Sequence, residues 1–65
     1  MTPLKFTIPT MACAACAETI TQAVHQVDPN AQVEADPTTK LVKINTVASN
    51  AAITEAIAMA GYPIA

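Results

Sequence analysis

Apolar and polar residues alternate along residues 4–8, LKFTI, and this period of two predicts a β-strand. Leu4, Phe6 and Ile8 fall on one side of that strand and are expected to face the core. Pro9 ends the run because proline has no backbone N–H for a strand ladder. The first predicted element is therefore a short strand with an apolar inner face.

The period then changes to helical spacing over residues 14–27. The apolar stripe of this predicted helix is Ala17, Ile20, Val24 and Val27. Its polar side carries Glu18, Thr21, Gln22, His25 and Gln26. The sequence DPN at 28–30 ends the helix.

Two further alternating runs, residues 32–35 and 41–47, predict a β-hairpin. The sequence between them, DPTTK at 36–40, places Pro at the second position of a tight turn. Val42 and Ile44 are expected to face inward from the second strand of the hairpin.

A second helix is predicted after Ser49 or Asn50, since either residue can cap a helix N-terminus. Gly61 supplies the left-handed conformation that ends a helix. Residues 62–64, YPI, leave room for one short strand, which Pro63 would restrict to the edge of a sheet. The apolar stripe of the helix is Ile53, Ala56, Ile57 and Ala60.

The order strand, helix, strand, strand, helix, strand predicts an α+β fold of the ferredoxin-like βαββαβ type. In that fold a four-stranded antiparallel sheet carries both helices on one face. At 65 residues the chain is expected to form one domain, residues 1–65, without repeats or linkers.

Composition and charge narrow the functional classes. The chain is 52% hydrophobic and 12% charged, which favours a folded domain. Three lysines, no arginine and a net charge of −2 argue against binding to nucleic acid. No apolar run approaches the roughly 20 residues that span a bilayer. We see no secretory signal after Met1, so the protein is expected to be cytoplasmic and not inserted in a membrane.

The two cysteines of the chain stand three positions apart in MACAACAE, residues 11–18. Cys13 follows the first strand, and Cys16 falls in the first turn of the first helix. The unpaired N–H groups and the positive dipole at a helix N-terminus stabilise thiolates, so both thiols are expected to have a lowered pKa. Glu18 in the same turn opposes this slightly.

Several roles are open to such a pair: packing, a disulfide, thiol–disulfide redox chemistry, or metal binding. A disulfide over so short a loop adds little stability and would be reduced in the cytoplasm. Zinc prefers four ligands, and the single histidine, His25, lies about 13 Å from Cys16 along the helix axis. Two thiolates alone suit soft, two-coordinate Cu(I), so the spacing favours monovalent copper.

The sequence TMACAAC at residues 10–16 resembles the M-x-C-x-x-C signature of the heavy-metal-associated (HMA) domain family. This family includes small copper chaperones of bacterial type and the amino-terminal domains of copper-transporting P-type ATPases. AGY at residues 60–62 stands where bacterial members commonly carry a tyrosine. The resemblance extends over essentially the whole chain.

The resemblance implies a role for four residues. Cys13 and Cys16 would be the Cu(I) ligands, and Met11 would turn inward and pack under the metal-binding loop. Tyr62 would lie near the sulfurs and donate a hydrogen bond to a thiolate, although it could also be an ordinary half-buried aromatic residue. Ala12 stands where zinc-preferring relatives often carry an acidic residue, which weakens the case for zinc.

The function implied by the resemblance is that of a Cu(I) chaperone, a carrier and not an enzyme. Its partners would be the metal-binding domains of copper-transporting P-type ATPases, with transfer by ligand exchange between thiolates. A copper-bridged homodimer is a further assembly that two copies of the cysteine pair allow. The alternatives are an excised metal-binding domain of such an ATPase and, with less support, a thiol–disulfide redox module.

Overall fold

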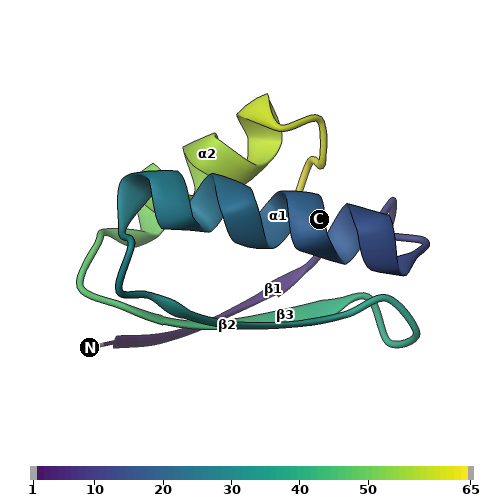
Figure 1. The fold of residues 1–65 in the computed structure, drawn as a ribbon, viewed down its shortest axis with the longest axis horizontal. Helices are drawn as coiled ribbons and strands as arrows, with labels where there is room; N and C mark the ends of the chain where they lie inside the picture. The colour runs from purple at the N-terminus through teal and green to yellow at the C-terminus, as the bar shows by residue number, and fades with distance from the viewer. Residues whose placement is uncertain (1, 65) are drawn as a thin grey trace.

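Two helices lie on one face of a β-sheet in the computed structural model, which describes residues 2–64 (Figure 1). Both helices and the hairpin form where the sequence pattern predicts them. The elements in chain order are β1 (Thr2–Thr7), α1 (Ala14–Val27), β2 (Gln32–Asp36), β3 (Leu41–Thr46) and α2 (Asn50–Met59).

The sheet is antiparallel, and β3 is its central strand, with β1 and β2 on either side. The register places Ile44 opposite Leu4 on one side and Val33 on the other. Val42 is likewise opposite Phe6. Because side chains alternate along each strand, this register puts the apolar positions of all three strands on the face that the helices cover.

Buried side chains from β1, α1, β3, α2 and two of the loops form one core, against which the partly buried Val33 and Ala35 of β2 pack. Ile8 faces inward as predicted, although β1 ends one residue before it. The inward prediction for Val42 and Ile44 is also confirmed, whereas Val47 lies beyond the end of β3 and is 78% exposed. The core residues are Phe6, Ile8, Met11, Ile20, Val24, Ala31, Val42, Ile44, Ile53 and Ile57.

The prediction that Val27 belongs to the buried stripe of α1 is wrong, because this side chain is 40% exposed. Val27 is the last residue of α1, and it lines a surface groove between α1 and α2 together with Met59. Its angular position matches that of Ile20 and Val24, but at the end of α1 the neighbouring helix leaves it partly uncovered.

Helix α2 begins and ends at the residues that the sequence marks. The hydroxyl of Ser49 accepts a hydrogen bond from the Ala52 N–H, with 3.1 Å between the atoms. Gly61 has a positive φ of 96°. The Tyr62 N–H donates to the Ile57 carbonyl at 3.3 Å, which closes the helix in a Schellman-type turn.

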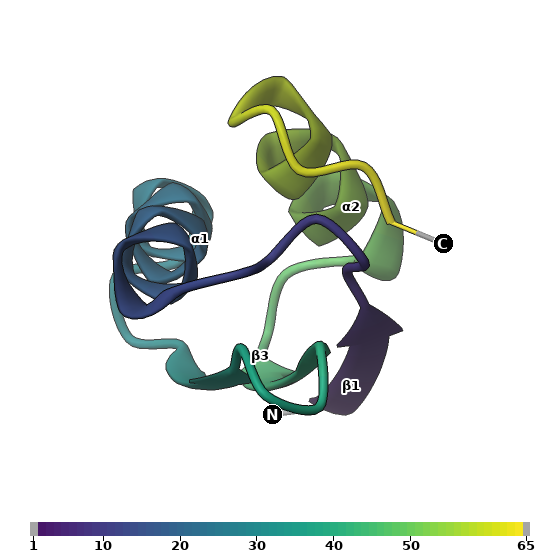
Figure 2. The ribbon, with the colours of Figure 1, turned by 90° about the vertical axis from the view of Figure 1, so that its right-hand side faces the viewer.

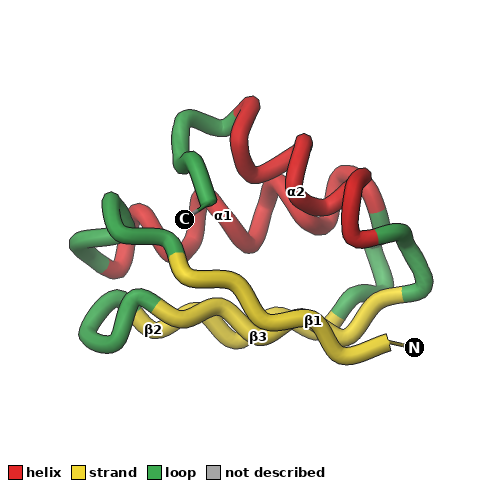
Figure 3. Tube along the Cα trace, turned by 180° about the vertical axis from the view of Figure 1, so that it is seen from behind, coloured by secondary structure: helices red, strands yellow, loops and turns green. Residues whose placement is uncertain are grey.

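The fourth strand expected at residues 62–64 is absent from the part of the chain that the structure describes, so the prediction of a four-stranded sheet is wrong there. The Tyr62 N–H is already used by the Ile57 carbonyl, and Pro63 has no N–H. One backbone donor, that of Ile64, is too few for a ladder. The side chains of Tyr62 and Ile64 instead pack against the core, and Figure 3 draws the segment as a loop.

Three connections meet at one end of the molecule (Figure 2). They are the loop between β1 and α1, the turn of the β2–β3 hairpin, and the segment after α2. The Ile8 N–H donates to the Lys40 carbonyl at 2.9 Å and so joins the first two connections. The cysteine-bearing loop is therefore bordered by two other segments of the chain.

A polar cluster joins α1 to β3 at the opposite end. Asp28, directly after α1, is only 7% exposed and accepts a hydrogen bond from the Thr46 hydroxyl at 2.6 Å. Its two carboxylate oxygens also accept from the backbone N–H groups of Asn30 and Val47. These donors, the Thr46 hydroxyl first, hold the pKa of Asp28 below its ordinary value.

We expect Thr46→Val to lower the Tm at neutral pH by roughly 5–10 °C, because it removes the hydroxyl that binds the Asp28 carboxylate. The folded state favours the ionised Asp28, so this contribution is present above the ordinary pKa and is lost as pH falls through the lowered one. The Tm deficit of Thr46→Val should therefore shrink in acid.

Thr46→Ser is the matched control, since it keeps the hydroxyl and removes only a methyl group. Its Tm deficit should not depend on pH. The measurement is the Tm of both variants, relative to wild type, between neutral and acidic pH. A Tm deficit of Thr46→Val that did not change with pH would show that the hydrogen bond to Asp28 contributes nothing to stability.

Candidate metal centre

The sulfur atoms of Cys13 and Cys16 lie 3.2 Å apart at the start of α1. A disulfide bond is about 2.05 Å long, so both residues are thiols within hydrogen-bonding distance. Cys13 is exposed, whereas Cys16 is partly buried and packs against the core. The pair thus combines one sulfur open to solvent with one held by the protein.

The local geometry follows from an uncapped helix N-terminus. Cys13 occupies the N-cap position in an extended conformation, and its side chain makes no capping hydrogen bond. Its carbonyl accepts the Ala17 N–H at 3.1 Å, so Cys16 is the third residue of the helix. Cys16 thereby holds the position that Glu occupies in a capping box, and the backbone N–H groups of Ala12 and Cys13 lower the pKa of its thiol.

These contacts favour the thiolate of Cys16. The pKa of Cys16 is lowered from its ordinary 9.0 to about 7, first by a hydrogen bond from Tyr62, then by the Ala12 N–H and by the Cys13 thiol. Burial opposes the shift. The same contact with Cys16 raises the pKa of Tyr62, so the phenol stays protonated and acts as the donor.

Met11 is fully buried, as the resemblance implied, and belongs to the hydrophobic core. Its N–H donates to the Ile8 carbonyl at 3.0 Å, which turns the chain back after β1. The thioether is thereby held beneath the loop and away from the surface on which Cys13 is exposed.

His25 is on the exposed side of α1, as predicted, but its ring is not simply solvated. The Nε2 atom lies 3.0 Å from the Ala31 carbonyl, and because a carbonyl only accepts, Nε2 carries the proton. Across residues 2–64 no group of three or more His, Cys, Asp or Glu side chains is placed to hold a metal ion. Within that range, no third His, Cys, Asp or Glu side chain joins the two thiols.

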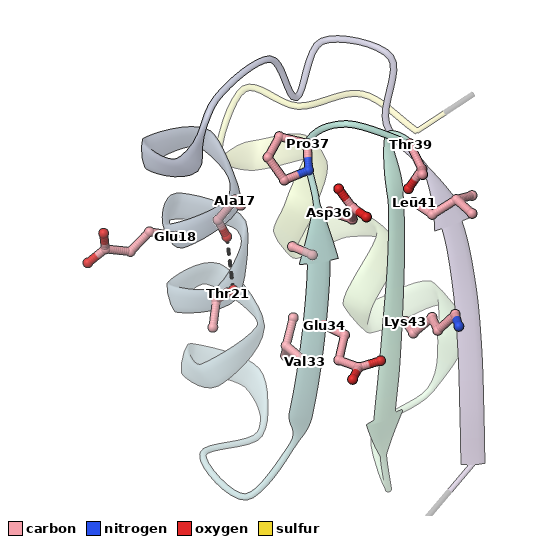
Figure 4. A pocket seen from close by; sticks show the side chains of 11 residues that line it. Ala17, Glu18, Thr21, Val33, Glu34, Asp36, Pro37, Thr39, Leu41 and Lys43 are labelled. Carbon is pink, nitrogen blue, oxygen red and sulfur yellow. Dashed lines mark hydrogen bonds between the residues drawn. The ribbon is translucent and has the colours of Figure 1, made fainter.

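A groove elsewhere on the surface lies between α1 and β2 (Figure 4). Glu18, Glu34 and Asp36 are among its lining residues, and neither cysteine is. Figure 4 shows the Glu18 side chain pointing away from the sheet. The candidate metal centre is thus an exposed loop at the end of the molecule and not a cavity.

Sequence reasoning missed Lys40 in the hairpin turn. Its ammonium Nζ donates to the Met11 carbonyl at 2.7 Å, although 29 residues separate the two. Lys40 also has a positive φ of 65°, which is uncommon for a residue other than glycine. The turn sequence DPTTK predicts a tight turn but carries no signal for this long-range contact.

The model of the heavy-metal-associated domain family matches residues 5–63. The chain therefore belongs to the heavy-metal-associated domain family, as its M-x-C-x-x-C sequence indicated. A search of curated protein sequences found no match. None of the helices in residues 2–64 has the length and apolar character needed to cross a membrane.

Among solved structures, the chain is similar to the copper chaperone Atx1 from Synechocystis PCC6803 in a trimeric form of a His-to-Tyr variant. The identity is 42%, the match covers 95% of this chain and 98% of that chain, and the TM-score is 0.92. A gold binding protein is 38% identical over 92% of each chain, with a TM-score of 0.89. Protein Atu1203 from Agrobacterium tumefaciens is 38% identical over 92% of this chain and 94% of that chain, with a TM-score of 0.86.

Tyr62→Phe should raise the pKa of Cys16 from about 7 toward 9.0, because the phenol hydroxyl is the first cause of the lowered value. The measurement is the rate of alkylation of Cys16 in the metal-free protein as a function of pH, resolved by peptide mass spectrometry. Melting curves control for loss of structure. If the pH midpoint of the alkylation rate did not change, the role of Tyr62 would be packing alone.

The metal-free protein should become more stable as pH is raised from about 7 to 9.0. In this interval the thiol of Cys16 is still protonated in the unfolded chain but already ionised in the folded chain. The free energy of unfolding therefore rises with pH. The gain is lost as pH falls through about 7. Urea unfolding under reducing conditions measures the effect, and Cys16→Ala should lack this pH-dependent component. If the free energy of unfolding depended on pH equally in both proteins, the lowered pKa would not belong to Cys16.

Proposed function

We propose that this protein is a Cu(I) chaperone that binds the ion through Cys13 and Cys16. The observation that carries the proposal is the pair of thiols 3.2 Å apart at the helix N-terminus, one of them exposed. Cu(I) is a soft ion that accepts two thiolate ligands, and a site without a third protein ligand suits it better than zinc. In this proposal the metal is cargo, and no catalytic turnover takes place.

The related structures support a soft metal as the cargo. Atx1 from Synechocystis is described as a copper chaperone, and the second similar protein is named for binding gold. Copper and gold in their monovalent states both favour sulfur ligands and low coordination numbers. Their common chemistry is that of a bis-thiolate site, which Cys13 and Cys16 provide here.

The unequal exposure of the two sulfurs suits a handover by ligand exchange. An incoming thiolate of the partner adds to Cu(I) from the solvent side and gives a three-coordinate ion. The exposed Cys13 then dissociates, and a second partner thiolate displaces Cys16, which Tyr62 and two backbone N–H groups hold in place. Each Cu–S bond breaks as another forms, so the oxidation state stays constant and no free ion is released.

The partner in this proposal is the metal-binding domain of a copper-transporting P-type ATPase, and the location is the cytoplasm. A reducing compartment keeps both cysteines as thiols, which metal binding requires. A second copy of the chain also offers two thiolates, so a copper-bridged homodimer is the alternative assembly.

Cys13→Ala and Cys16→Ala should each reduce Cu(I) affinity by at least about 100-fold, because each removes half of the coordination shell. The measurement is anaerobic competition against a chromophoric Cu(I) chelator. His25→Ala is the matched control on the same helix and should leave the affinity unchanged, since its ring binds the Ala31 carbonyl.

Near-wild-type affinity in either cysteine variant would mean that the ligands are assigned wrongly. A parallel titration with zinc should show weaker binding. Reduction of insulin disulfides tests the redox alternative, and turnover in that assay would replace the carrier function with a catalytic one.

A further inference from the structure

Lys40 reaches from the hairpin turn into the loop that carries the cysteines. Its Nζ lies 2.7 Å from the carbonyl oxygen of Met11, a short hydrogen bond between a charged donor and a backbone acceptor. Met11 is two residues before Cys13, and its side chain is fully buried. The ammonium therefore acts on a segment that is anchored on its inner side by the core.

The backbone of Lys40 is itself held in place. Its N–H donates to the Asp36 carbonyl at 2.9 Å, and its own carbonyl accepts the Ile8 N–H at 2.9 Å. The first hydrogen bond closes the hairpin turn and the second ties the turn to the residue that follows β1, with Lys40 at a φ of 65°. A non-glycine residue in this conformation is uncommon, and here it carries a side chain that makes a specific long-range contact.

The Met11 carbonyl and the Ala12 N–H belong to the same planar peptide group, and in a trans peptide they point in opposite directions. Lys40 binds the oxygen of this group, and the N–H on its other side, that of Ala12, is one of the groups that stabilise the thiolate of Cys16. Hydrogen bonds linked through one peptide polarise one another, so the ammonium strengthens the donor that faces the sulfur.

We propose that Lys40 is a positioning residue of the metal centre: by binding the Met11 carbonyl, it fixes the plane of the Met11–Ala12 peptide and directs the Ala12 N–H at the sulfur of Cys16. The arrangement of this peptide is a property of the metal-free protein. Its consequence for copper rests on the proposed function, in which Cys16 is a ligand.

The test compares Lys40→Met with Lys43→Met. Both variants lose one positive charge from the same hairpin, but Lys43 is exposed and faces away from the core. In the metal-free Lys40→Met protein, the Ala12 amide should show a changed NMR shift and hydrogen exchange about 3- to 10-fold faster than in wild type. Cu(I) affinity should fall by about 3- to 10-fold. Lys43→Met should change neither.

Lys40→Gly guards against a folding defect in Lys40→Met, because glycine adopts a positive φ without strain while removing the ammonium. It should show the same two changes in a protein with an intact turn. Unchanged exchange at Ala12, or faster exchange with unchanged copper affinity, would overturn the proposal. Absence of Cu(I) binding in the wild type would refute the proposed function, while exchange at Ala12 would still decide the role of Lys40 in the loop.

Discussion

Burial of Ile8 and Met11 is the constraint on which the thiol geometry depends. Both side chains are fully buried, and they lie on the segment that leads from β1 to Cys13. Each contributes roughly 1.5–3 kcal/mol when removed from water. A loop anchored in this way cannot swing freely, so the first turn of α1 starts at a defined place and Cys13 is presented at the surface.

The hydrogen bonds around the loop build on that anchor. The core holds the inner side of the segment, Lys40 binds a carbonyl on it, and the hydroxyl of Tyr62 contacts Cys16 from the segment after α2. At the far end, Asp28 and Thr46 join α1 to β3 through a buried hydrogen bond. Helix α1 is thus held at both ends, which suits the metal centre proposed at its N-terminus.

A carrier that releases its metal needs one firmly held ligand and one accessible ligand, and the proposed site has both. Cys16 accepts hydrogen bonds that stabilise its thiolate, whereas Cys13 is exposed. No third His, Cys, Asp or Glu side chain joins the pair within residues 2–64, and in the proposed function the partner thiolate takes that place. Under the proposed function, the two cysteines provide both tight binding and rapid transfer of the metal. Cu(I) binds two thiolates strongly, and it also accepts a third thiolate transiently during ligand exchange.

Local pattern was enough to predict the two helices and the first three strands. The period of two in residues 4–8, the helical spacing in residues 14–27, the cap at Ser49 and the left-handed Gly61 each depend on neighbours in the chain, and each prediction agrees with the structure. The placement of both cysteines at the start of α1 follows from the same local rules.

Contacts between distant segments were decided by the tertiary structure. The fourth strand was predicted at 62–64, but the Tyr62 N–H closes α2 and Pro63 has no donor, so side-chain packing replaces a ladder. Val27 fits the apolar stripe and is still exposed, because burial depends on what covers the end of a helix. The contact of Lys40 with Met11 spans 29 residues, and a hydrogen bond to a backbone carbonyl leaves no pattern in the sequence, since every residue has such a carbonyl.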